Sequence, residues 1–264
     1  MTTDEMWKLT LRKILQTGVE TAPRDLKTKD VSSNTTVFHM RYPVLLSPAR
    51  KLSYQFMAAE AVWILSGSDR VDEIAPWNKN IAKFSDDGQT FYGAYGPRIL
   101  PQLKHVVEAV IRDRASRQAA LTIWRENPPA TKDVPCTIAM VFRCNEDRTV
   151  DNHVFMRSSD AWLGLPYDVF NFSMVAHLVC CRLNDLPVNG KHYTPGRLYL
   201  TAASSHLYEP NWGGAETCFA EATNDRDQPP TPASFYTRED VLLDTLTFLR
   251  DSKPGDPMRW WEVK

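Results

Sequence analysis

Alternating strand-like and helical segments run through the middle of the chain and constrain its fold more than any other feature. Residues 119–124, 136–143 and 150–156 have the apolar or alternating pattern of β-strands, and residues 100–114 and 171–183 have the pattern of helices. Neither an internal repeat nor a low-complexity linker interrupts this order. The sequence therefore predicts a single mixed α/β (α+β) domain over residues 1–264.

The flanking segments complete this pattern. We expect helices over residues 5–17, 51–66 and 235–249, a strand over 36–44 and a strand-like segment over 189–200. Residues 19–35 are polar, and residues 85–99 are rich in glycine and aromatic side chains, so both are predicted to be loops.

The composition excludes several classes of protein. With 43% hydrophobic and 24% charged residues it is typical of a soluble globular chain, and a net charge of −1 speaks against a broad DNA-binding surface. No apolar run approaches the ~20 residues of a membrane span, and the acidic start differs from a secretory signal, so a cytoplasmic protein is expected. The five cysteines form no CxxC pair, and no metal site is expected.

Cys136 follows a proline at the start of a predicted strand. A free cysteine is more often a core residue than a nucleophile, because a reactive thiol needs a cationic neighbour. Arg157 is a candidate for that neighbour, or it binds a phosphate together with Ser158. Arg24 and Arg117 are further candidates for an anion site, although a single arginine is usually a solvated surface charge. The pattern leaves these alternatives open.

Glu60 stands among apolar and small residues within the predicted helix 51–66. A glutamate on a helix is commonly exposed, but apolar neighbours on both sides favour burial here. A buried carboxyl group has a raised pKa and needs polar partners, so Glu60 is a candidate acid or base.

Several short motifs, taken in order, resemble those of the thymidylate synthase family, closest to the cytidylate (CMP/dCMP) hydroxymethylase branch. The resemblance extends from the first predicted helix to residue 210, and its motifs are Ala59-Glu60-Ala61, Tyr95-Gly96, Ser116-Arg117, Pro135-Cys136, Arg157-Ser158-Ser159-Asp160, Leu163-Gly164-Leu165-Pro166 and His206-Leu207-Tyr208. It implies a thymidylate synthase-like mixed β-sheet layered with helices, in a homodimer whose subunits pack sheet to sheet.

The resemblance also implies the roles of individual residues. Cys136 would add to C6 of a pyrimidine, Glu60 would act as acid and base through ordered water, and Tyr95 would relay a proton near C5. The co-substrate would be 5,10-methylenetetrahydrofolate. Its expected contacts are Asp160, Leu163, Gly164 and Tyr167. The nucleotide phosphate would meet Arg24, Arg157 and Ser158 of one subunit and Arg117 of the other, and His206 and Tyr208 would bind the sugar 3′-hydroxyl.

Asp168 departs from the pattern, since thymidylate synthases have an asparagine there. Uracil offers an acceptor at O4 and a donor at N3, whereas cytosine offers a donor at N4 and an acceptor at N3. A neutral carboxylic acid pairs with cytosine, and an ionised carboxylate pairs with cytosine that is protonated at N3. An ionised carboxylate has no donor for O4 of uracil. Asp168 therefore predicts a cytosine substrate and a part in catalysis, unless it is a harmless replacement or a surface acid.

Further departures point to water as the final nucleophile. The tryptophan that synthases place against the folate is replaced by Ile81, with Trp77 nearby, and the histidine after the nucleophile is replaced by Thr137. Gln118 replaces a second phosphate-binding arginine, and the C-terminal residues 260–264 do not match the usual closing tail. A less shielded site would admit water and yield a 5-hydroxymethyl product.

The sequence thus predicts a CMP or dCMP hydroxymethylase that uses methylenetetrahydrofolate. A dUMP-using thymidylate synthase or dUMP hydroxymethylase is the enzymatic alternative, and a nucleotide- or RNA-binding protein without catalysis is the other. The sequence does not distinguish ribose from deoxyribose in the substrate. It does not identify the pathway either, because the synthesis of modified phage DNA and of a nucleoside natural product would both use this chemistry.

Overall fold

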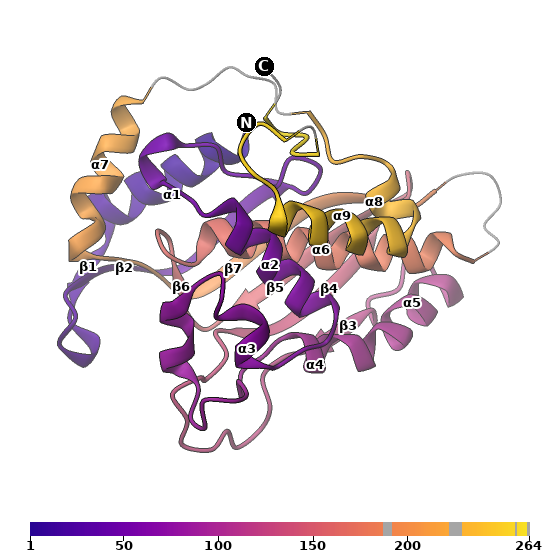
Figure 1. Cartoon of the computed structure of the whole chain (residues 1–264), viewed down its shortest axis with the longest axis horizontal. Helices are drawn as coiled ribbons and strands as arrows, with labels where there is room; N and C mark the ends of the chain where they lie inside the picture. Colours follow the sequence, from indigo (N-terminus) through magenta and orange to yellow (C-terminus); the bar gives the residue numbers. More distant parts are fainter. Residues whose placement is uncertain (187–191, 222–228, 257, 263–264) are drawn as a thin grey trace.

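The computed structural model describes residues 1–186, 192–221, 229–256 and 258–262. Within them lies a seven-stranded sheet with the strand order β1-β2-β7-β5-β4-β3 and with β6 paired to β7 (Figure 1). The strands are β1 (Val19–Thr21), β2 (Thr28–His39), β3 (Ala120–Thr122), β4 (Thr137–Cys144), β5 (Thr149–Met156), β6 (Ser159–Asp160) and β7 (Thr194–Tyr208). Strands β5 and β6 run parallel to β7, and the other pairs are antiparallel, so the sheet is mixed as predicted.

Helices cover one face of this sheet. They are α1 (Thr3–Thr17), α2 (Tyr54–Leu65), α3 (Val71–Ile74), α4 (Gly96–Ile99), α5 (Leu103–Arg112), α6 (Leu165–Asn184), α7 (Trp212–Ala220), α8 (Ser234–Thr237) and α9 (Glu239–Asp251). Helix α6 packs on β5 and β7, and α2 and α9 lie in front of it (Figure 1). The predicted layering of a mixed sheet with helices is therefore confirmed.

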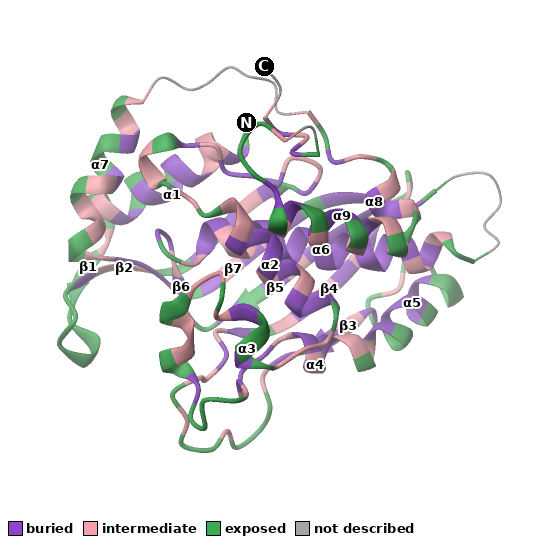
Figure 2. Cartoon of the chain, in the orientation of Figure 1, coloured by how far each residue is buried: buried purple, intermediate pink, exposed green. Residues whose placement is uncertain are grey.

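Helix α6 is apolar on nearly all sides. Gly164 caps its start, Pro166 occupies the first turn, and an almost unbroken run of buried residues follows. A helix that is hydrophobic all round belongs in the core, and Figure 2 shows α6 buried along most of its length. The few polar side chains on α6, Asp168 and Asn171 among them, are consequently carried into the interior.

The opposite face of the sheet carries no helix of the described residues. Phe155 on β5 is 42% exposed there, and the ring of His153 stacks on that of Tyr199 of β7 at 4.5 Å. Phe155 and Thr201 are paired in the register of β5 with β7, and Thr35 of β2 contacts Thr201 through its hydroxyl group. This face is open and mixed in polarity.

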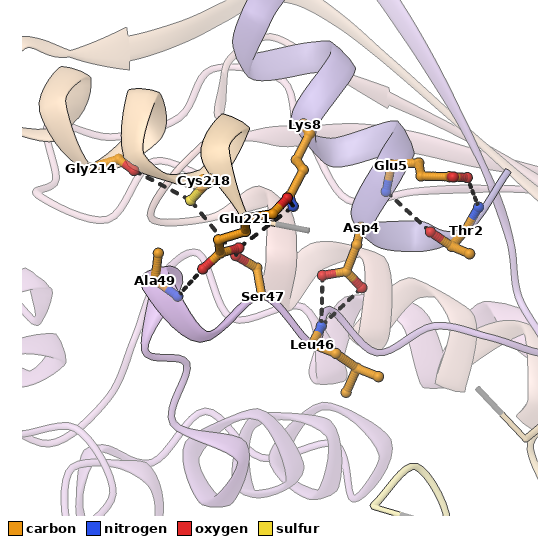
Figure 3. Close-up of polar contacts among 10 residues, drawn as sticks. All are labelled: Thr2, Asp4, Glu5, Lys8, Leu46, Ser47, Ala49, Gly214, Cys218 and Glu221. Carbon is orange, nitrogen blue, oxygen red and sulfur yellow. Dashed lines mark hydrogen bonds and ion pairs between the residues drawn. The ribbon is translucent and has the colours of Figure 1, made fainter. Parts of the chain in front are cut away.

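The N-terminal helix holds the segment that leads into the cleft described below (Figure 3). Asp4 accepts hydrogen bonds from the backbone N–H of Leu46, and the carboxylate of Glu221 accepts from the N–H of Ala49 at 2.7 Å. Lys8 pairs with Glu221 at 3.6 Å. The short 3₁₀ helix η2 (Pro48–Arg50) is thereby fixed, and Arg50 donates to the carbonyl of Trp162 at 2.6 Å.

The predicted loop over residues 19–35 is wrong, because this segment contains β1 and most of β2. Its buried polar side chains find hydrogen-bond partners in place of apolar contacts. Lys13 of α1 donates to Asn34 at 2.7 Å, and Asn34 donates to Thr36 at 3.2 Å. A strand satisfied in this way lacks the apolar alternation that sequence analysis relies on.

Other boundaries also differ from the prediction. The strand expected over 36–44 ends at His39, and the helix expected over 171–183 begins at Leu165. The strand expected over 189–200 begins at Thr194 and continues to Tyr208, and its residues 189–191 lie outside the described part of the chain. Helix α7 was not predicted. The helices expected over 5–17, 51–66 and 235–249 are present as α1, as α2, and as α8 with α9. The helix expected over 100–114 is present as the 3₁₀ helix η4 (Leu100–Gln102) followed by α5, and α4 lies at the end of the segment 85–99, which was predicted to be a loop.

Candidate active site

Two adjoining pockets form one cleft beside the start of α6. Both are lined by Glu60, Ile81, Phe84 and Asp168. The first also has Tyr95, Cys136 and Asn171 in its wall and a cavity volume of about 190 Å³. The second is also lined by Arg50, Asp160, Leu163, Gly164 and Tyr167. The fold therefore gathers the four residues predicted to be catalytic with the four predicted to contact the co-substrate.

Cys136 precedes β4 at the mouth of this cleft and is the one partly exposed cysteine; the other four are buried. Its carbonyl accepts from the backbone N–H of Arg157 at 2.9 Å, and the Arg157 guanidinium donates to the carbonyls of Pro135 and Val134 at 3.0 and 2.9 Å. Burial raises the pKa of the Cys136 thiol, and the positive charge of Arg157 opposes that rise. The predicted pairing of thiol and arginine is present.

Glu60 lies on α2 with its carboxylate facing α6. Its Oε2 atom accepts a hydrogen bond from Nδ2 of Asn171 at 2.6 Å. Burial raises the pKa of Glu60 to about 7, although the hydrogen bond from Asn171 acts in the opposite direction. A carboxyl group with such a pKa exchanges its proton readily near neutral pH, as a general acid or base must.

Tyr95 lines the first pocket together with Glu60 and Cys136 and contacts the residue after the cysteine. Thr137 donates through Oγ1 to the phenolic oxygen of Tyr95 at 3.0 Å. Burial and the nearby acidic groups Asp168 and Cys136 raise the pKa of Tyr95 far above its usual value. The phenol therefore stays protonated and has its own hydrogen to donate.

Asp168 lies in the first turn of α6, inside the cleft rather than on the outer surface. Burial raises its pKa well above the ordinary value, and the neighbouring carboxyl groups of Glu60 and Asp160 raise it further. Burial therefore favours the neutral carboxylic acid form of Asp168 over the ionised form. The alternative of a surface acid is excluded.

The second pocket has the features of a site for a flat heteroaromatic group. Asp160 accepts through Oδ1 from the N–H groups of Trp162 and Leu163, both at 2.8 Å. Tyr167 accepts from the N–H of Ser53 at 3.2 Å, and the Arg50 guanidinium lies 5.4 Å from the ring of Trp162. A carboxylate beside exposed apolar side chains, of which Leu163 is 53% exposed, fits the polar edge and apolar face of a pterin.

The wall between the two pockets lacks the tryptophan of thymidylate synthases. Ile81 lines both pockets, as expected from its place in the sequence, whereas Trp77 lies 5.5 Å beneath the guanidinium of Arg250 and lines neither. Phe84, 45% exposed, supplies an aromatic ring at this wall. Ile81 and Phe84 both belong to the 3₁₀ helix η3 (Lys79–Phe84).

The predicted phosphate- and sugar-binding residues lie outside these two pockets. Arg24 is exposed in the turn between β1 and β2, and its charge slightly favours the thiolate of Cys136. Ser158 follows Arg157 between β5 and β6. His206 of β7 is paired in register with Asp160, and its ring lies 5.1 Å from that of Tyr208. These residues border the cleft without lining it.

Arg117 is not part of this cleft. It is exposed between α5 and β3, and β3 forms one edge of the sheet. Strand β1 forms the opposite edge, and Arg24 follows β1 in the chain. The two arginines therefore flank opposite edges of one sheet. This placement leaves the sharing of a phosphate site between subunits as a prediction.

Sequence analysis missed Asn171, Arg50, Phe84 and Asp133. Asn171 had a usable signal, since an amide one turn after Asp168 in an apolar helix must face something polar. Asp133 accepts from the N–H of Gly93 at 2.7 Å, and a Cβ atom on Gly93 would lie 2.4 Å from the Asp133 carbonyl. Only glycine permits this approach, which fixes the loop before Cys136 against the loop before Tyr95.

Two negative findings apply to the described part of the chain. No group of three or more His, Cys, Asp or Glu side chains there could hold a metal ion. No helix in the same residues is long and apolar enough to cross a bilayer.

Comparison with known proteins agrees with this geometry. Residues 5–231 match the sequence profile of thymidylate synthase. The deoxyuridylate hydroxymethyltransferase of Bacillus phage SP01 is 27% identical over 232 residues, which cover 78% of this chain and 57% of the relative. The deoxyuridylate hydroxymethyltransferase of Delftia phage PhiW-14 is 31% identical over 147 residues, which cover 49% of this chain and 41% of the relative. The thymidylate synthase of Buchnera aphidicola subsp. Baizongia pistaciae is 23% identical over 203 residues, which cover 72% and 76%. The chain thus spans about half the length of the hydroxymethyltransferases it matches. Taken with the fold, these matches show that the chain belongs to the thymidylate synthase family.

Proposed function

We propose that residues 1–264 form one catalytic domain that hydroxymethylates C5 of a cytidine monophosphate, CMP or dCMP. The family's co-substrate is 5,10-methylenetetrahydrofolate, and the family transfers one carbon to a pyrimidine nucleotide. The observation that carries the proposal is the buried carboxyl group of Asp168 within the cleft that also holds Cys136 and Glu60.

The first step is attack by Cys136 on the base. Its sulfur forms a bond to C6 while the π electron pair of the C5–C6 bond moves to C5, which becomes nucleophilic. Arg157 favours the thiolate needed for this step. Methylenetetrahydrofolate would supply the carbon that C5 receives. As the C5 hydrogen leaves as a proton, the bond from that carbon to the folate nitrogen would break, which leaves an exocyclic methylene carbon on C5 and releases tetrahydrofolate. Asp160, Leu163 and Tyr167 would hold its pterin in the second pocket.

Proton transfers fall to Tyr95 and Glu60. Tyr95 stays protonated, so it relays the hydrogen lost from C5 rather than holding it, and Thr137 orients its phenol. In the last step water adds to the exocyclic methylene carbon and gives a proton to Glu60. The electron pair returns to the ring as the bond from sulfur to C6 breaks, which releases the product and the thiolate. The pKa of Glu60, about 7, suits this role.

Hydroxymethylation rather than methylation is supported by the wall between the pockets. Ile81 occupies the place of the shielding tryptophan, and Phe84 there is 45% exposed. Water is less well excluded by an isoleucine than by a large flat ring over the same surface. Three of the relatives are named deoxyuridylate hydroxymethyltransferase, in agreement with this chemistry.

Those names also favour the second candidate, a deoxyuridylate hydroxymethylase. Asp168 bears on the choice between the two, because its ionised form has no donor for O4 of uracil, whereas its neutral form can pair with either base. The test uses deuterium exchange to measure the folate-dependent loss of the C5 hydrogen from CMP, dCMP, UMP and dUMP. Loss from a cytidine nucleotide in preference to its uridine counterpart supports the proposal, and the reverse preference supports the second candidate. Binding without any loss would instead indicate a nucleotide-binding protein.

We further propose that the active form is a homodimer with a shared phosphate site. The helix-free face of the sheet with Phe155, His153 and Tyr199 offers a surface for a second copy. Arg117 lies at the sheet edge away from its own cleft, where it is available to the cleft of a partner subunit. Arg24, Arg157 and Ser158 would complete the phosphate contacts, and His206 and Tyr208 would bind the sugar.

A further inference from the structure

Burial favours the protonated form of Asp168, and that form creates a problem for base selection. A carboxylic acid can direct its O–H to N3 of cytosine and its C=O to the N4 amino group. With the proton on the other oxygen, it can equally direct O–H to O4 of uracil and C=O to the N3 hydrogen. No hydrogen bond in the described structure fixes which oxygen carries the proton. A neutral Asp168 therefore accepts either base, and discrimination requires a second contact whose donor and acceptor cannot be exchanged.

Asn171 is fixed in the required way. Its side chain is 3% exposed and lines the first pocket together with Glu60, Asp168 and Cys136. The Nδ2 group is committed to Glu60 at 2.6 Å, so the amide cannot be turned round without facing its oxygen to that carboxylate. The Oδ1 atom is buried and has no hydrogen-bond partner in the structure. An unpaired buried acceptor is uncommon in a folded protein, and it is often satisfied by a ligand.

The surroundings of this oxygen are rich in acceptors. Asn171 follows Asp168 by three residues on α6, so both side chains project from the same face of the helix. The carboxyl group of Glu60 is close enough to that of Asp168 to raise its pKa. An oxygen-rich wall of this kind attracts a group that carries two hydrogens. The exocyclic amino group of cytosine is such a group, whereas O4 of uracil is only an acceptor.

We propose that Asn171 is a specificity-determining residue, whose Oδ1 accepts a hydrogen bond from the C4 amino group of the cytosine ring. One N4 hydrogen would go to Asp168 and the other to Asn171. Uracil would instead bring O4 against Oδ1, and two acceptors would face each other without water. This inference rests on the proposed cytidylate specificity, and it assigns the selection to two side chains of α6 rather than to Asp168 alone.

The test compares nucleotide binding by wild type and by Asn171→Leu, which keeps the approximate shape of the side chain and removes its acceptor. Dissociation constants for CMP and UMP, and for dCMP and dUMP, are measured by titration calorimetry, so that the readout does not depend on turnover. We expect the ratio of cytidine to uridine affinity to fall about tenfold or more, because one matched hydrogen bond is lost and one clash between acceptors is relieved. Asn171→Ala is made in parallel in case the leucine variant does not fold.

Asn152 provides the matched control. It is a fully buried asparagine on β5 that donates to the carbonyl of Phe172 at 3.2 Å and also has an unpaired Oδ1, but it does not line the cleft. Asn152→Leu should lower stability and leave the affinity ratio unchanged. A second readout is the pH profile of turnover, which Asn171→Leu should move to higher pH, because the hydrogen bond that lowers the pKa of Glu60 is lost.

The outcomes separate the two claims. If wild type prefers cytidine nucleotides and the Asn171 variants lose that preference, both claims are supported. If wild type prefers cytidine nucleotides and the Asn171 variants keep the same ratio, this inference is wrong and the proposed function stands. If wild type prefers uridine nucleotides, the proposed function is wrong and the role assigned to Asn171 fails with it.

Discussion

The part of the cleft predicted to bind the base, which Glu60, Asn171 and Asp168 line, differs from the predicted phosphate-binding arginines in burial and in its place in the fold. Glu60, Asn171 and Asp168 come from two packed helices, and each is held by burial or by a short hydrogen bond inside one chain. Arg24 and Arg117 are exposed on connections at opposite edges of the sheet. If the proposed function is right, chemistry and base choice depend on the core of a single chain, whereas phosphate binding depends on peripheral segments and on a neighbouring subunit.

The largest expected effect is that of Cys136→Ala, which removes the nucleophile from the cleft. We expect turnover to fall by about 10⁴-fold or more, because no other group in the cleft can form the bond to C6. Product formation would be followed by chromatography. Cys144→Ala, a buried cysteine outside the cleft, is the control and should retain turnover. Substantial activity in Cys136→Ala would contradict the covalent mechanism.

The next effect is that of Glu60→Gln. We expect kcat to fall by roughly 10²–10⁴-fold, since the variant cannot take the proton of water. Wild-type kcat should decline as the pH falls below about 7, because protonation of Glu60 removes the base, and this decline should disappear in Glu60→Gln. The measurement is kcat from pH 5.5 to 9. A wild-type profile that is flat across neutral pH would show that Glu60 is not the titrating base.

The same shift in the pKa of Glu60 affects stability with a defined sign. The folded-state pKa of about 7 lies above the ordinary glutamate value of 4.5, so the folded chain binds more protons in this interval and its stability falls as the pH rises through it. Glu60→Gln carries no titrating group, so it should be stabilised relative to wild type at pH 8 by about 1–3 kcal/mol. Urea denaturation at pH 5 and at pH 8 measures this. If the difference in unfolding free energy between Glu60→Gln and wild type is the same at pH 5 and at pH 8, the burial of Glu60 does not raise its pKa as described.

Asp168→Asn should have a smaller effect on overall turnover and a clear one on substrate choice. An amide restores the donor and acceptor that uracil requires, so the preference for cytidine over uridine nucleotides should drop by tenfold or so. The measurement is kcat/KM for both nucleotides in direct competition. An unchanged preference would mean that base selection lies elsewhere in the cleft.

The smallest effect is expected from the periphery. Arg117→Ala should raise KM for the nucleotide about tenfold with little change in kcat, because a charged hydrogen bond to phosphate is lost. Arg112→Ala, exposed nearby at the end of α5, should leave KM unchanged. Mixing the Arg117→Ala chain with a Cys136→Ala chain, which supplies an intact Arg117, should restore a normal KM. If KM stays raised in the mixture, Arg117 does not act across subunits.

The sequence predicted the central elements of the fold because their apolar patterns are strong. Helix α6 and strands β4 and β5 are apolar and were predicted. The loop predicted over residues 28–35 of β2 is wrong, because Asn34 there is buried through hydrogen bonds rather than apolar contacts. Cys136, Glu60, Tyr95 and Asp168 were found through motifs. Asn171 and Phe84 were not, since their importance comes from packing between segments that are distant in sequence.

The protonation of Asp168 also required the structure. Its raised pKa arises from burial beside Glu60 and Asp160, which are 108 and 8 residues away in the chain and meet only in the fold. Likewise, the separation of Arg24 and Arg117 follows from the strand order, which no local pattern specifies.

The most direct test of the account is product identification by mass spectrometry after incubation with methylenetetrahydrofolate and, separately, CMP, dCMP, UMP and dUMP. We expect a 5-hydroxymethyl product from a cytidine nucleotide together with tetrahydrofolate. Whichever of CMP and dCMP gives more product identifies the sugar of the substrate. A 5-methyl product from dUMP together with dihydrofolate would contradict both the base selection by α6 and the role of water.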